Sequence, residues 1–144
     1  MSRTFSTALA FALAMTGTAA FAETVEVLML NRGEEGTMVF EPSFVRVEPG
    51  DTVKFVATDR GHNAESILDM IPEGADAFKG KINEEIEVTL DVPGVYAIKC
   101  QPHYAMGMVM TIAVGEDVEV PPSYLEGRIP PKSQERLAEQ FENL

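Results

Sequence analysis

The chain has one cysteine and two histidines among 144 residues, and these rare residues occur beside a methionine. Cys100, His103 and Met108 lie in the stretch KCQPHYAMGM, and His62, the second histidine, lies in DRGHNAES. One thiolate, two imidazoles and one thioether make up the ligand set of a blue copper electron-transfer centre. The single thiolate and the methionine favour copper over zinc, whose structural sites take four Cys or His ligands.

Each of these residue types has a chemical use in such a site. A thiolate donates strongly to Cu(II), and imidazoles suit both oxidation states of copper. A weakly bound thioether leaves the metal free of the tetragonal geometry that Cu(II) prefers. A fixed site that is acceptable to both states reduces the rearrangement needed when one electron moves, so the residues predict an electron-transfer centre.

Short strands are expected to position the four residues. Alternating apolar segments between turns predict at least six strands, typical of an antiparallel sandwich or barrel. Val53 and Phe55 should point to one face of their strand, and Ile86, Val88 and Leu90 should point inward on another. Cys100 would end a strand and Met108 would begin the next, so a hairpin could aim both side chains at one point. His62 follows a strand that ends near Ala57, and its loop could meet the same point.

The last part of the chain changes character at Pro121. Leu137, Phe141 and Leu144 lie at positions i, i+4 and i+7, which predicts an amphipathic helix starting near Pro131. A shorter helical piece at 123–127 is a weaker prediction. The apolar stripe is expected to cover an open face or edge of the sheet.

The N-terminus has the features of a cleaved export signal. Arg3 precedes an apolar stretch that is too short to cross a bilayer, and the small residues Ala20 and Ala22 form a cleavage pattern. We expect residues 1–22 to be removed on export to an oxidising compartment and 23–144 to form a single domain, with a helical extension at about 121–144. The lone Cys100 cannot form an internal disulfide.

The formal net charge is −12, and removal of the signal with Arg3 makes it more negative by one. This acidic balance argues against nucleic acid as a partner. Two other functions remain open from the residues. Cys100 could be the nucleophile of a thiol enzyme with a histidine as base, or the chain could store or deliver copper.

Longer stretches carry a family resemblance. GVYAIKCQPHYAMGMV, GHN at 61–63 and MVFEPSFVRVEPGDTV resemble the pseudoazurins, periplasmic type 1 copper proteins of the cupredoxin fold. Plastocyanins share the C-x2-H-x4-M spacing but lack the helical extension. The resemblance implies a mainly β, eight-stranded Greek-key sandwich closed by two C-terminal helices, with copper bound by His62, Cys100, His103 and Met108.

The resemblance also implies roles around the metal. The backbone N–H of Asn63 would reach the Cys100 sulfur, and the Asn63 side chain would join the two ligand loops. Pro102 would keep one donor away from the sulfur, and Met38 would lie against the His103 ring. The sequence departs from the pseudoazurin pattern at Ala105, where glycine is usual. Alanine would be strained there if the position requires positive φ.

The implied partners are redox proteins. The electron would leave through His103, with Tyr104, Ala105 and Met106 in an apolar docking surface. Nitrite reductase is the first expected partner, followed by nitrous oxide reductase or a cytochrome, and the processed protein is expected to be a monomer without membrane insertion. Five basic residues are expected to surround the docking surface and to orient the encounter: Arg32, Arg60, Lys79, Lys81 and Lys99.

Overall fold

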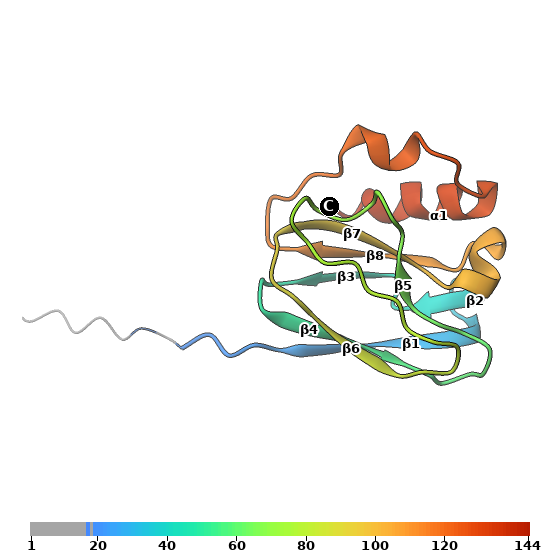
Figure 1. Cartoon of the computed structure of the whole chain (residues 1–144), viewed down its shortest axis with the longest axis horizontal. Helices are drawn as coiled ribbons and strands as arrows, with labels where there is room; N and C mark the ends of the chain where they lie inside the picture. The colour runs from blue at the N-terminus through green and yellow to red at the C-terminus, as the bar shows by residue number, and fades with distance from the viewer. Residues whose placement is uncertain (1–16, 18) are drawn as a thin grey trace, which may run out of the picture.

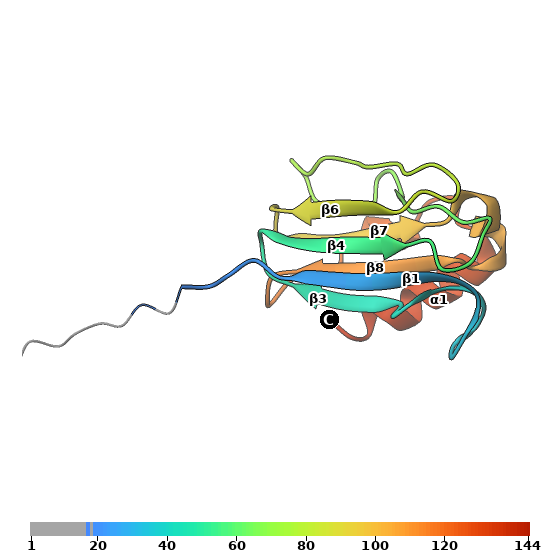
Figure 2. The same ribbon diagram turned by 90° about the horizontal axis from the view of Figure 1, so that it is seen from below.

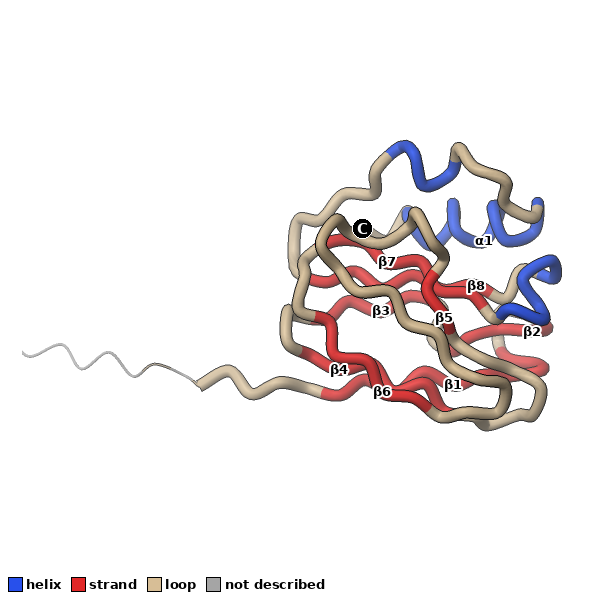
Figure 3. Tube along the Cα trace, viewed as in Figure 1, coloured by secondary structure: helices blue, strands red, loops and turns tan. Residues whose placement is uncertain are grey.

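The computed structural model describes residue 17 and residues 19–144 as two β-sheets packed face to face, with a helix on the outer side of one of them (Figures 1 and 3). The predicted export signal at 1–22 lies mostly outside the described residues. In the part of the chain that the structure describes, no helix has both the length and the apolar character needed to span a membrane.

Each sheet has four strands. The first sheet has the order β2, β1, β4, β6, with bounds Gly36–Glu41, Thr24–Gly33, Asp51–Val56 and Ile86–Leu90. The second has the order β3, β8, β7, β5, with bounds Phe44–Val47, Val109–Val114, Gly94–Lys99 and Glu65–Ser66. The expected mainly β sandwich of about eight strands is confirmed.

Two strand pairs differ from the antiparallel arrangement that the turn spacing suggested. β1 pairs with β4 in parallel, and β3 pairs with β8 in parallel. The chain leaves the first sheet after β2, contributes β3 to the second sheet and returns as β4. When the chain passes from one sheet to the other, a later strand can pair with an earlier strand in the same direction. The positions of turns in the sequence do not reveal such parallel pairs.

The core lies between the sheets and follows the expected alternation. Val53 and Phe55 of β4 are fully buried, and Lys54 between them is only half-buried. In β7 both faces are covered. Tyr96 packs into the core between the sheets, whereas Val95 belongs to a second apolar cluster on the outer face.

That outer cluster is completed by the C-terminal segment. The helix α1 (Pro131–Phe141) begins at the predicted proline and buries Leu137 and Phe141 against the second sheet; it runs over β7 and β8 in Figure 1. The first of the two expected helices is a four-residue 3-10 turn, η2 (Pro122–Leu125). Its Tyr124 hydroxyl donates to the Val95 carbonyl at 2.9 Å.

The segments that carry the predicted ligands gather at one end of the sandwich. The 3-10 helix η1 (Gln101–Met106) connects β7 to β8, and the loop after β4 carries His62. The N-terminal segment leaves from the opposite end (Figure 2).

Replacing the central residue of the helix stripe should destabilise the domain. Leu137 has no exposed surface, so Leu137→Ala is expected to lower the free energy of unfolding by about 2–5 kcal/mol. Urea denaturation followed by circular dichroism measures this loss. Leu68→Ala is the matched control, because Leu68 is 71% exposed and its truncation should change the free energy by less than about 0.5 kcal/mol. Equal effects of both substitutions would contradict the placement of the helix.

Candidate metal centre

Three of the four predicted ligands meet at the loop end of the sandwich. Nδ1 of His62 lies 3.0 Å from Nδ1 of His103. The Cys100 sulfur lies 3.8 Å from the first of these nitrogens and 3.5 Å from the second. Residues separated by up to 41 positions in the sequence thus place two nitrogens and one sulfur around a common point.

These separations fit one metal ion. Bonds of about 2.0–2.1 Å to imidazole and about 2.3 Å to thiolate, at angles of roughly 100–120°, place neighbouring donors roughly 3.1–3.8 Å apart. The two nitrogens and the sulfur fall close to that range. Two histidines and one cysteine in this arrangement are the donor set typical of blue copper, so the residues present fit the implied metal.

Asn31 sets the protonation of the buried ligand His62. Its Oδ1 lies 2.8 Å from Nε2 of His62. A carbonyl oxygen only accepts, so Nε2 carries the hydrogen and Nδ1 is left bare toward the metal position. Burial lowers the pKa of His62, and His103 lowers it further, which favours the neutral form that binds a metal. Sequence reasoning missed Asn31, which lies far from the ligand motifs.

Cys100 is fully buried. Burial raises the pKa of its thiol, while the backbone N–H groups of Asn63 and His103 oppose that rise. Without a metal, the thiol therefore holds its proton and reacts poorly as a nucleophile. This argues against the hypothesis that Cys100 is the nucleophile of a thiol enzyme. A metal ion would supply the positive charge that stabilises the thiolate.

Met108 is held beside the other ligands by the backbone. The Cys100 N–H donates to the Met108 carbonyl at 3.0 Å, and the Met108 N–H donates to the His103 carbonyl at 3.1 Å. Met108 is fully buried in the same apolar cluster as Cys100. The four predicted ligand residues are thus brought to the same end of the fold.

The loop turns at Gly107 and not at Ala105. Ala105 lies inside η1, whereas Gly107 adopts the left-handed conformation with φ of 89°. A Cβ at Gly107 would also lie 2.6 Å from a side-chain carbon of Lys132. The strain anticipated for alanine at 105 therefore does not arise, because the residue that needs positive φ is still a glycine.

The Asn63 side chain connects the two ligand loops. Its Oδ1 accepts the Gln101 N–H at 2.7 Å, and its Nδ2 donates to the Gly80 carbonyl and to Glu65, each at 3.0 Å. Asn63 follows His62, and Gln101 follows Cys100. This amide therefore fixes the two loops relative to each other.

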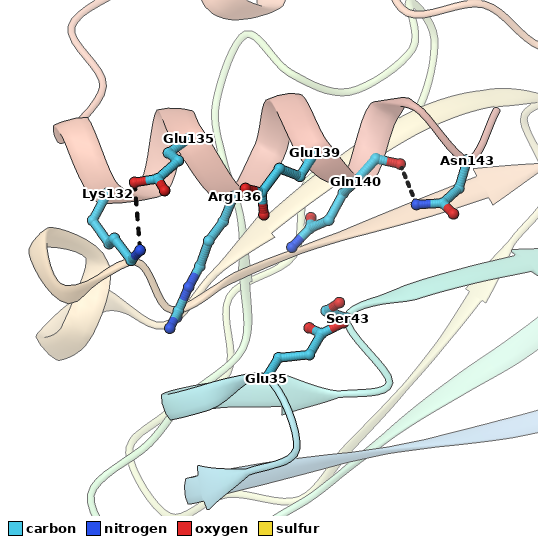
Figure 4. Close-up of a pocket in the computed structure, with 8 residues that line it drawn as sticks. All are labelled: Glu35, Ser43, Lys132, Glu135, Arg136, Glu139, Gln140 and Asn143. Atoms are coloured by element: carbon cyan, nitrogen blue, oxygen red, sulfur yellow. Dashed lines mark hydrogen bonds and ion pairs between the residues drawn. The ribbon is translucent and has the colours of Figure 1, made fainter.

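The helix α1 supports the ligand loop from outside. The Ser133 hydroxyl donates to the Tyr104 carbonyl, and Arg136 donates to the carbonyls of Gly107 at 2.7 Å and Met38 at 3.0 Å. Arg136 extends from α1 along the pocket that the helix forms with Ser43 (Figure 4). These contacts were not predicted, because the helix was predicted from the spacing of its apolar residues, which says nothing about the partners of its polar residues.

The other predicted residues are found as follows. Pro102 is exposed within η1, and Met38 is half-buried against the core with φ of 51°. Four of the basic residues are exposed: Arg32, Arg60, Lys79 and Lys81. Lys99 is different, since its ammonium lies 3.5 Å from Glu65 and 4.9 Å from the centre of the Tyr104 ring.

Comparison with known proteins gives the family. Residues 27–115 match the model of copper binding proteins of the plastocyanin/azurin family. Pseudoazurin of Paracoccus pantotrophus is 48% identical over 130 residues, which cover 90% of this chain and 90% of that protein. Pseudoazurin of Methylorubrum extorquens is 52% identical over 108 residues, covering 75% and 72% of the two chains.

A solved structure agrees with the sequence matches. The crystal structure of pseudoazurin from Methylobacterium extorquens superposes with a TM-score of 0.79 at 43% identity, over 83% of this chain and 98% of that one. His62, Cys100, His103 and Met108 are the ligands of a type 1 copper site. The chain belongs to the plastocyanin/azurin family of copper binding proteins and, within it, to the pseudoazurins, as an electron-transfer protein.

Proposed function

We propose that this chain is an exported periplasmic carrier that delivers single electrons to denitrification enzymes, with nitrite reductase as its first partner. Nitrous oxide reductase and a cytochrome are further redox partners in this proposal. The partners are inferred from the likeness to pseudoazurins, and export is inferred from the signal at 1–22. The observation that carries the function is the convergence of the nitrogens of His62 and His103 on the Cys100 sulfur.

The burial of the ligands indicates the path of the electron. Copper, when bound, supplies the one-electron couple Cu(II)/Cu(I). His62, Cys100 and Met108 are fully buried, whereas His103 is partly exposed. His103 is therefore the ligand through which an electron can reach a docked partner. Asn63 and Arg136 hold the loops in place, which limits movement of the ligands between oxidation states.

The surface around His103 suits transient docking. Ala105 and Met106 of η1 are exposed, with Met106 at 48%, and Tyr104 is half-buried. The exposed lysines Lys79 and Lys81 lie on the segment whose Gly80 carbonyl accepts from Asn63 beside the site. A basic patch on an acidic protein produces a dipole that orients the encounter with a negatively charged partner.

The ligand assignments can be tested by spectroscopy. Cys100→Ala should abolish the intense thiolate-to-copper absorption of the copper-loaded protein, because no other cysteine is present. Met108→Gln should keep a copper site with a lower reduction potential, since the axial ligand tunes that potential. Met106→Gln is the matched control on the exposed loop and should leave both properties unchanged. A potential unaffected by Met108→Gln would disprove the axial role.

The docking surface can be tested by kinetics. The double substitution Lys79→Gln with Lys81→Gln should slow electron transfer to nitrite reductase several-fold at low ionic strength and should weaken its dependence on salt. Stopped-flow absorbance at several salt concentrations measures both. Lys54→Gln is the control, because Lys54 pairs with Glu26 and Glu85 on the first sheet. An unchanged rate and salt dependence in the double variant would place the docking surface elsewhere.

A further inference from the structure

A buried carboxylate lies next to the copper loops without being a ligand. Glu65, in β5, is 6% exposed. Its carboxylate lies 3.5 Å from the ammonium of Lys99, 4.0 Å from that of Lys79 and 3.0 Å from Nδ2 of Asn63. A carboxylate this buried is costly unless it is paired and hydrogen-bonded. Glu65 is both paired and hydrogen-bonded, so the fold stabilises a negative charge at this buried position.

The backbone holds Glu65 in this position from two sides. β5 pairs with β7 so that Glu65 lies opposite Lys99, the residue before Cys100. An isolated bridge places Glu65 opposite Lys79 as well. The side chain of Glu65 is therefore fixed between two lysines by main-chain pairing, and the contacts do not depend on the long lysine side chains alone.

Glu65 and the Gly80 carbonyl together determine which way the Asn63 amide points. An amide has one accepting oxygen and one donating nitrogen. Glu65 and the Gly80 carbonyl both accept, so both hold Nδ2 on their side and turn Oδ1 toward the Gln101 N–H. The opposite orientation would place an oxygen against two acceptors. Glu65 thus supports the contact between the two ligand loops.

We propose that Glu65 is a positioning residue of the copper centre that also sets its reduction potential by charge. The carboxylate orients Asn63, and its negative charge in a buried setting favours the oxidised metal over the reduced one. Lys99 opposes this effect, because its positive charge lies beside the same carboxylate. The inference rests on the copper site and not on the partner, so it can be measured without any partner protein.

The charge effect is tested by a cycle of neutral variants. Glu65→Gln keeps an acceptor for Asn63 and removes the charge, so the midpoint potential of the copper-loaded protein should rise while its visible absorption is retained. Lys99→Gln should shift the potential in the opposite direction. The double variant should lie between the two single variants. Glu87→Gln, on an exposed position of β6, should leave the potential unchanged.

The positioning role of Glu65 needs a measurement that does not respond to the charge of its side chain. In the reduced, diamagnetic protein, amide hydrogen exchange at Gln101 reports its bond to Asn63. Glu65→Ala should speed this exchange about two- to tenfold, because it removes one of the two acceptors that hold Nδ2 and leaves only the Gly80 carbonyl. Glu65→Gln should protect the amide nearly as well as the carboxylate does. A potential that is unchanged or lowered in Glu65→Gln would overturn the charge role, and equal protection in all variants would overturn the positioning role.

Discussion

The structure depends on holding two imidazole nitrogens and one thiol sulfur within 3.0–3.8 Å of one another inside a protein. The groups of His62 and Cys100 give up water on burial, and that loss is not recovered unless each group finds a partner. Copper is the partner that satisfies all of them together. The surrounding fold therefore has to keep the donors close and oriented whether the metal is oxidised or reduced.

Hydrogen bonds from three separate parts of the chain supply this constraint. Asn31, from β1, orients the ring of His62. Asn63 ties the loop that carries His62 to the loop that begins after Cys100. Arg136, from α1, anchors the far end of the second loop at Gly107. Because each support comes from a different element, movement of one ligand is resisted by the packing of the whole sandwich.

The same arrangement divides the molecule into a buried site and an exposed contact surface. His62 and Cys100 have no exposed surface, whereas His103 is partly exposed beside exposed residues of η1. Lys99 occupies both regions, because it precedes a ligand, pairs with the buried Glu65 and lies over the Tyr104 ring. Lys99 therefore connects the buried carboxylate of Glu65 near the metal site with the Tyr104 ring on the contact surface.

The sequence by itself determined the features that depend on residue type and local spacing. The ligand set, the alternation in strands such as β4 and the apolar stripe of α1 are local patterns, because period and side-chain chemistry act over a few residues. Only the tertiary structure decided the parallel pairing of β1 with β4 and the contacts of Asn31 with His62, of Glu65 with Lys99 and of Arg136 with Gly107. Those features arise where segments far apart in the chain meet, and local spacing carries no information about such meetings.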